Sequence, residues 1–430
     1  MTSLQVFSLG LLAFTFAVAL WRGVNVGLAM LPAAFLLAGV AHIPLKQLYA
    51  GFPASLVILV LGVMYLFGHA IRSGGIDRLV IRAERAVGDR DWLLPWVSFL
   101  LAGVISAIGA LPVAALAVVL PIAMQTARRR QIDPMLMSVV TIMGALAGGF
   151  SPISVWGQLI RTLGLKLQYD VPAYSLFGLE LVLNTALAVV AFFVYRGWAL
   201  MRRQPPAAPV DTGTADDGAP VIRGGAPMSR YEVASLAAIV VFVVAVLGFK
   251  LDVGLTAFAL GALLHLAFAT DERSVISALP WPVVLIIAGV LTYINLLLKT
   301  GALDAITRYM QSIDNGTLGI IALAYFASVF ASFESSQVAV LAVIVPVALQ
   351  VELGLPHTMP LLLLVLTIVA YSAVVTSTSP FHVSGALAIA NTAGAAEARS
   401  LFRRLLVWTI AVAAGVPIVS SILPLVLQAT

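Results

Sequence analysis

The chain has 430 residues, of which 61% are hydrophobic and only 10% are charged, and its mean hydropathy is +1.06. This composition excludes an ordinary soluble domain and predicts a polytopic helical membrane protein. The net charge of +5 is small and scattered, so no nucleic-acid partner is expected, and a chain without cysteine has neither disulfides nor thiolate metal sites.

The chain opens with three apolar segments that are long enough to cross a bilayer, at about 4–20, 24–41 and 54–72. A basic stretch at 69–90 follows the third segment, and Ile76, Leu79 and Val80 fall on one helical face within it. This pattern predicts an amphipathic helix that lies on the membrane surface.

Residues 93–124 form two apolar arms of about 16 residues each, which are split by the sequence from Gly109 to Pro112. Each arm is short for a full crossing, and both flanks are basic, which favours a re-entrant hairpin with both ends on one side of the membrane. Two full spans would satisfy the charges as well.

The next apolar segment, 134–166, is interrupted at Ser151-Pro152, about 24 Å along a helix that starts at Pro134. A backbone break at that depth survives only where it is buried in protein or lines a wet cavity, so we expect a binding site there. A span at 176–200 follows, and the segment 204–230, rich in Pro, Ala, Gly and Asp, is expected to be a disordered linker.

The second half of the chain repeats the first. Residues 379–385 match 151–157 at four of seven positions, and 341–348 align with 116–123. The expected segments of the second half are a hairpin at 317–349, a broken helix at 358–391 and a last span at 405–427. Several matches in one order at nearly one offset indicate a duplication, and broken helices at corresponding positions are typical of transporters.

The expected fold class is therefore an all-α polytopic membrane protein with two inverted repeats, 1–203 and 231–430. Each repeat has five spanning helices, a re-entrant hairpin and a broken helix, and the helices of 1–90 form a scaffold. An odd number of spans inverts the second copy. With the linker placed in the cytoplasm, 18 of the 24 lysine and arginine residues lie inside, so both termini are expected outside.

Several segments resemble the MatC family of bacterial dicarboxylate carriers: Ala50-Gly51-Phe52-Pro53, the basic stretch after the third span, Ser106 to Pro112, and Gly148 to Ser154. The resemblance is close over most of the first repeat and looser over the second. It implies the ion transporter superfamily, which also holds divalent-anion/sodium symporters. It further implies a homodimer in a bacterial inner membrane, with a fixed scaffold and moving transport domains of the elevator type, that takes up malonate-like dicarboxylates with Na⁺.

In the symporter relatives, Ser-Asn-Thr motifs occur at the hairpin tips and adjoining helix breaks. This chain instead has Ser-Ala-Ile-Gly at one tip and Ser-Phe-Glu-Ser-Ser-Gln at the other. The tips therefore depart from the family's pattern.

Each repeat should direct two helix starts at a shared cavity, and four positive dipole ends suit a dianion. The expected substrate-binding residues are Ser106, Gly109, Ser151, Pro152, Ser154, Ser335, Ser336, Thr378, Ser379, Pro380 and His382. Ser379 and Pro380 resemble the cap and first residue of a new half-helix. The alternative is that these hydroxyls only cap helices or satisfy the broken backbone.

A hard cation such as Na⁺ prefers oxygen ligands, which the broken backbone supplies. The expected Na⁺ ligands are Gly148, Gly149, Ser151, Glu334, Val375, Thr376 and Ser377, and no other cofactor is expected. Glu334 could bind the cation or carry a proton, or its charge could only favour the next helix dipole. His382 could meet a substrate carboxylate when protonated, or stay neutral and bonded to backbone. Trp156 could wall the cavity or pack between helices.

A secondary transporter working by alternating access is the first functional hypothesis, and a cation/proton antiporter of the same superfamily is its main rival. A channel is less expected, because no ring of equivalent pore-lining groups is apparent. An enzyme is least expected, because the five histidines are dispersed and neither His-Glu-x-x-His nor Gly-x-Ser-x-Gly occurs.

Overall fold

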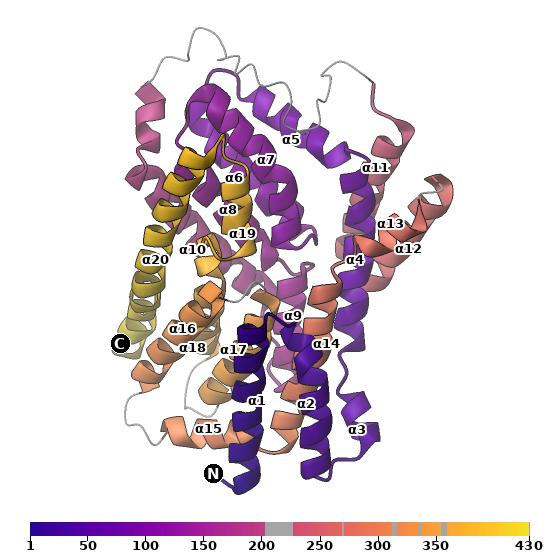
Figure 1. The fold of residues 1–430 in the computed structure, drawn as a ribbon, viewed down its shortest axis with the longest axis vertical. Coiled ribbons are helices and arrows are strands. Elements are labelled where there is room, and N and C mark those ends of the chain that lie inside the picture. The colour runs from indigo at the N-terminus through magenta and orange to yellow at the C-terminus, as the bar shows by residue number, and fades with distance from the viewer. Residues whose placement is uncertain (203–226, 269–270, 312–315, 334–336, 354–358, 430) are drawn as a thin grey trace.

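The computed structural model describes residues 1–202, 227–268, 271–311, 316–333, 337–353 and 359–429, and this part of the chain is all-helical (Figure 1). Six of its helical segments are long and apolar enough to cross a membrane. Helices suit a bilayer, because each backbone N–H and C=O must find its partner within its own segment. The predicted class, an all-α multi-pass membrane protein, is confirmed.

The first half holds the helices α1 (Ser3–Arg22), α2 (Val26–Val40), α3 (Leu45–Ala50), α4 (Ala54–Arg72), α5 (Gly75–Ala86), α6 (Leu94–Ala107), α7 (Pro112–Arg130), α8 (Pro134–Gly149), α9 (Val155–Lys166) and α10 (Ala173–Val194), with 3₁₀ turns at Asp91–Leu93 and Gly197–Arg202.

The second half holds α11 (Arg230–Phe249), α12 (Val253–Phe268), α13 (Glu272–Ser277), α14 (Trp281–Lys299), α15 (Ala302–Gln311), α16 (Gly316–Phe333), α17 (Gln337–Leu353), α18 (Met359–Val375), α19 (Val383–Ala390) and α20 (Ala395–Ala429), with a 3₁₀ turn at Thr376–Thr378. Within the described residues, each helix from α1 to α10 thus has a counterpart in the same order from α11 to α20.

The two halves pack on each other reciprocally. Helix α4 lies against α12, and its counterpart α14 lies against α2, while α6 and α7 pack on α8 as α16 and α17 pack on α18. The short amphipathic helices α5 and α15 lie near opposite ends of the molecule (Figure 1). Two oppositely oriented copies would produce such an arrangement, so the packing agrees with the predicted inverted duplication.

Both predicted broken helices are present, but each half-helix begins later than expected. The expectation that Ser379 and Pro380 begin the second one is wrong, because α19 begins at Val383. His382 is its N-cap, and its Nδ1 accepts a hydrogen bond from the backbone N–H of Ser384 at 3.1 Å. The Ser379 hydroxyl is used elsewhere: it donates to the backbone oxygen of Ser332 at 3.3 Å.

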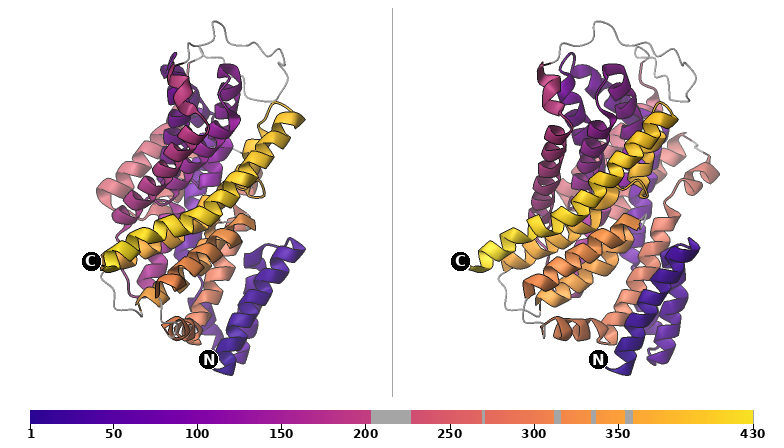
Figure 2. Two further views of the ribbon diagram at one scale, coloured as in Figure 1. Left: turned by 90° about the vertical axis from the view of Figure 1, so that its left-hand side faces the viewer. Right: turned by 60° about the vertical axis from the view of Figure 1, so that its left-hand side comes forward.

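The last helix also departs from the sequence expectation. A span at 405–427 is predicted, but α20 begins at Ala395 and forms one long rod (Figure 2). Its first turns are polar, and Arg404 makes a two-pronged ion pair with Asp133, the N-cap of α8 (Nη1 to Oδ1 2.8 Å). The helix extends to Ala395 because this polar section pairs with the first half of the chain. It therefore does not end at the boundary of the apolar segment.

Helix α5 is amphipathic, as predicted, and it buries Ile76 and Val80. It also buries Glu84, whose side chain is 8% exposed and accepts a hydrogen bond from the Thr126 hydroxyl. The other carboxyl oxygen has no hydrogen-bond partner among the described residues. Burial therefore raises the pKa of Glu84 from 4.5 to about 7, and the Thr126 hydrogen bond only partly opposes this shift.

The raised pKa of Glu84 predicts a pH-dependent stability. Between about pH 4.5 and 7 the folded protein binds more protons at this site than the unfolded chain, so stability falls as pH rises, by roughly 3 kcal/mol in total. We expect Glu84→Gln to flatten this decline and to raise the melting temperature above pH 7, measured on detergent-solubilised protein. Asp89→Asn, at a carboxyl that is 84% exposed, is the control and should leave the profile unchanged; identical profiles for wild type and Glu84→Gln would refute the assignment.

Candidate functional site

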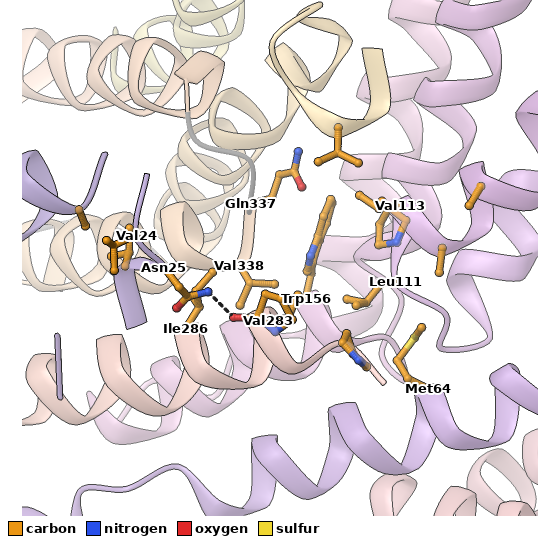
Figure 3. A pocket seen from close by; sticks show the side chains of 18 of the residues that line it. Val24, Asn25, Met64, Leu111, Val113, Trp156, Val283, Ile286, Gln337 and Val338 are labelled. Carbon is orange, nitrogen blue, oxygen red and sulfur yellow. Dashed lines mark hydrogen bonds between the residues drawn. The ribbon is translucent and has the colours of Figure 1, made fainter. Parts of the chain in front are cut away.

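A cavity of about 580 Å³ lies between the starts of α7 and α17 and the starts of α2 and α14 (Figure 3). Both halves of the chain contribute to its wall. The lining residues are Ala19, Gly23, Val24, Asn25, Val26, Met64, Leu111, Pro112, Val113, Ala114, Ala117, Trp156, Pro280, Pro282, Val283, Ile286, Gln337, Val338 and Val383. Most of this wall is apolar, as expected for a small-molecule site in which a few polar groups fix the ligand.

The N-termini of α7, α9, α17 and α19 meet at this cavity. Pro112 begins α7, Gln337 begins α17 and Val383 begins α19, while Trp156 lies in the first turn of α9, and all four residues line the cavity. The first N–H groups of a helix have no partner within the helix, and the helix dipole adds partial positive charge there. The convergence of helix starts that the sequence predicts is therefore present in the structure.

The scaffold side of the cavity is fixed by Asn25, which lies between α1 and α2. Its side-chain amide donates to the backbone oxygen of Pro282 at 2.9 Å, and its Oδ1 accepts from the N–H of Leu28 at 3.2 Å. Asn25 thus caps α2 and joins the start of α2 to the start of α14. The connection before α2 and the connection before α14 therefore form one part of the cavity wall.

The hydroxyls expected to bind substrate at the first break are engaged with nearby backbone. Ser151 donates to the oxygen of Ala107, and Ser154 donates to the oxygens of Gly149 and Ser151. Ser106 donates to the oxygen of Ala110 at 3.4 Å. None of these serines is among the described residues that line the cavity, and their hydroxyls tie the break to the hairpin.

The second break has the same arrangement. Thr376 donates to the oxygen of Ser328 at 3.3 Å, Ser377 donates to Val374, and Thr378 shares a hydrogen bond of 3.2 Å with Thr409. The expected cation ligands that the structure describes are all buried around the two breaks: Gly148, Gly149, Ser151, Val375, Thr376 and Ser377. The expected cation ligand Glu334 and the expected substrate-binding residues Ser335 and Ser336 lie outside the described residues. As a set of ligands, all of these residues stay a prediction.

Gln337 is a polar cavity residue that our sequence analysis passes over, although it directly follows the second tip. Its side-chain amide lies 2.6 Å from the hydroxyl oxygen of Ser377 and is hydrogen-bonded to Nε2 of His382. His382 is fully buried. The contact places a histidine ring directly behind the amide that reaches the cavity.

Glu180 is a second residue that the sequence analysis missed. It lies in the apolar helix α10, its side chain is fully buried, and neither carboxyl oxygen has a hydrogen-bond partner among the described residues. The Oδ1 of Asn184, one turn later, also lacks a partner there. Tyr371 of α18 donates to the backbone oxygen of Leu183 at 3.2 Å, so α10 meets α18 at this point. An acidic residue within an apolar span was the available signal.

Comparisons with known proteins agree with this picture. Residues 1–149 match the family described as "Dicarboxylate carrier protein MatC N-terminus". The chain also resembles the crystal structure of the Alcanivorax borkumensis YdaH transporter, described as having an unusual topology, with 12% identity and a TM-score of 0.57, over 89% of this chain and 88% of that one. A search of curated proteins found no match.

The resemblance to the MatC family is thus confirmed for residues 1–149. At 12% identity the likeness to the YdaH structure shows a shared fold. The match to a carrier family over residues 1–149 and the six apolar helices support a multi-pass membrane transporter rather than an enzyme.

Proposed function

We propose that the chain is a secondary active transporter that imports a small dicarboxylate, of the malonate or succinate type, together with Na⁺. The observation that carries this proposal is the convergence of the starts of α7, α9, α17 and α19 on one cavity. Helix starts attract anions, and two of them come from each half, so each carboxylate of a short dianion can face one half. The carrier family matched by residues 1–149 supports the substrate class.

The proposed mechanism is an elevator. Helices α1–α5 and α11–α15 would form the fixed scaffold, in which α2 crosses α14 and α4 crosses α12. The hairpins, broken helices and outer spans α10 and α20 would move as transport domains, since they pack mainly on one another, including across the two halves, where α9 meets α17 and α19 meets α7. The proposed assembly is a homodimer in a bacterial inner membrane, with both termini outside and the segment between α10 and α11 in the cytoplasm.

Na⁺ is proposed to bind at the breaks, where backbone oxygens gather. The oxygens of Gly148 and Gly149 already accept hydrogen bonds from the N–H of Ser151 and the hydroxyl of Ser154, respectively. A carbonyl oxygen has a second lone pair that can face a cation, and a dianion in the neighbouring cavity would favour the cation's binding. The same reasoning applies to the oxygen of Thr376, which accepts from the N–H of Ser379 at 2.8 Å.

Glu180 favours a second candidate, coupling to protons. A carboxylate without a partner in the membrane interior is costly, whereas the neutral acid is much less so. Such a group suits reversible proton binding. Its position on α10 places it beside α18, the helix that leads directly into the second break. In this version the dicarboxylate enters with protons instead of Na⁺.

Uptake of labelled malonate and succinate into proteoliposomes, under imposed Na⁺ or proton gradients, tests these proposals. We expect saturable uptake that follows the Na⁺ gradient. Uptake driven by a proton gradient and lost in Glu180→Gln would establish proton coupling instead, because glutamine keeps the shape but cannot ionise. Na⁺-evoked proton efflux without any organic anion would indicate an antiporter, and unsaturable flux would indicate a channel; either would overturn the proposed dicarboxylate import.

A further inference from the structure

We infer that Gln337 binds a carboxylate group of the substrate, and that His382 holds its side-chain amide so that the N–H donors face the cavity. This inference rests on the proposed transport of dicarboxylates and names a residue that recognises them. Gln337 is the first residue of α17 and lines the cavity (Figure 3). His382 is the N-cap of α19, and its ring is hydrogen-bonded to the side-chain amide of Gln337.

The hydrogen bonds of His382 fix the position of its proton. Its Nδ1 lies 3.1 Å from the backbone nitrogen of Ser384, and a backbone N–H can only donate. Nδ1 must therefore be an unprotonated acceptor. A histidine that is protonated on both nitrogens would point a second hydrogen at this N–H, so the ring is neutral, with its single proton on Nε2.

The protonated Nε2 needs an acceptor, and the group that faces it is the side-chain amide of Gln337. The amide atom on this side is assigned as nitrogen, but two N–H donors cannot share one hydrogen bond. Oxygen and nitrogen of a carboxamide are assigned from their hydrogen-bond partners, and His382 places Oε1 on its own side. The hydroxyl of Ser377, 2.6 Å away, can then turn its single hydrogen from the oxygen of Val374 to this oxygen.

With Oε1 held on that side, the NH₂ group of Gln337 points the other way, toward the cavity. The described residues of the surrounding wall are largely apolar, so they offer this NH₂ group few competing partners. A carboxylate oxygen is the acceptor that makes the strongest hydrogen bond with such a donor, and the N-terminus of α17 adds partial charge of the same sign. An amide fixed in the opposite sense would present an acceptor and repel the anion.

The first half of the chain lacks this pair. At the repeat offset that relates 116–123 to 341–348, the position of Gln337 is taken by Pro112, and the N-cap that corresponds to His382 is Ser154. The cavity is therefore asymmetric, with a side-chain amide at the start of α17 and a proline, which has no side-chain donor, at the start of α7. Gln337 would bind one carboxylate of the substrate, and helix starts of the first half would bind the other.

The first test is equilibrium binding of labelled malonate and succinate to purified full-length protein in nanodiscs. We expect Gln337→Met, which keeps the shape without donors, to weaken binding at least about tenfold, the effect expected of one lost charge-assisted hydrogen bond. Gln337→Glu should weaken binding further through charge repulsion. Gln350→Met, an amide removed from the same helix outside the cavity, is the matched control. Wild-type protein that binds neither dianion would refute the proposed function, whereas unchanged binding by Gln337→Met would refute only this inference.

The second test separates positioning from a structural role. Asparagine at position 382 can still cap α19 but is too short to reach Gln337, so His382→Asn should weaken binding as Gln337→Met does. In the double variant the two losses should not multiply, because both remove the same interaction. Multiplying losses would overturn the positioning role.

A spectroscopic measurement does not depend on how the variants fold. Nitrogen-15 spectra of histidine-labelled wild-type protein should show, among the five histidines, a neutral ring with its proton on Nε2 that belongs to His382. This signal should be missing from His382→Asn. A His382 signal from a doubly protonated ring, or from a ring with its proton on Nδ1, would overturn the inference.

Discussion

Gly289→Ala is expected to prevent the protein from reaching its folded state, because α2 and α14 cross with their backbones in contact. A Cβ atom added at Gly289 would lie 1.9 Å from the backbone oxygen of Gly27, and one added at Gly27 would lie 2.0 Å from that of Leu285. Neither neighbour is a side chain that can rotate away, so the two helices would have to separate along their contact. Such overpacking at a backbone crossing costs at least about 3 kcal/mol, a large part of a typical folding free energy.

The measurement is the yield and melting temperature of detergent-solubilised protein. Gly68→Ala is the matched control, since a Cβ there meets nothing within 4 Å, and alanine favours a helix more than glycine does. Gly62→Ala, at the corresponding crossing of α4 and α12, should behave like Gly289→Ala, because its Cβ would lie 2.3 Å from the oxygen of Gly254. Equal melting temperatures for Gly289→Ala and Gly68→Ala would show that α2 and α14 do not approach this closely.

These crossings explain why part of the fold could be predicted from the sequence. Gly27 and Gly254 are 227 residues apart, as are Gly62 and Gly289, and the repeated Val-Gly-Leu at 26–28 and 253–255 contains the first pair. The duplicated glycines keep the same role in both copies, so the repeat is visible in the sequence. Their contact partners are not visible, because each glycine packs against the opposite half, more than 190 residues away along the chain.

The candidate site was predictable in outline only. Breaks after Gly149 and Val375 follow from turn residues inside apolar segments, and the four helix starts do meet at one cavity. The side chains that face the cavity did not follow from this pattern. A helix break frees backbone carbonyls, and hydroxyls such as those of Ser151 and Ser379 are the nearest donors, so they turn toward the backbone and away from the cavity.

Gln337 and Glu180 show what the sequence analysis lacked. Gln337 is one polar residue at the edge of a polar tip, and only the contact with His382, 45 residues later, gives its amide an orientation. Glu180 is an acidic residue inside an apolar span, and this signal could have been used from the sequence alone. Recognition of Gln337 as a site residue depends on tertiary contacts. Recognition of Glu180 needed only a search for ionisable residues within the spans.

Gly385→Ala is expected to abolish most transport while the protein stays folded. Gly385 lies in the first turn of α19, and an added Cβ would lie 2.1 Å from the backbone oxygen of Ser379. Gly157 of α9 has the same distance to the oxygen of Ser151. Because both atoms belong to one connected segment at the break, the clash can be relieved by a local shift of the half-helix, and α18 and α20 need not move.

That local shift displaces Val383 and His382, and therefore the amide of Gln337. Misplacing a binding group by about 1 Å is enough to weaken a preorganised site strongly, so uptake into proteoliposomes should fall at least about tenfold. Melting temperatures should stay close to wild type, unlike those of Gly289→Ala. Gly394→Ala, where a Cβ meets nothing within 4 Å, should transport normally. Normal uptake by both Gly385→Ala and Gly157→Ala would mean that the start of neither half-helix positions the substrate, which would remove the physical basis of the proposed site.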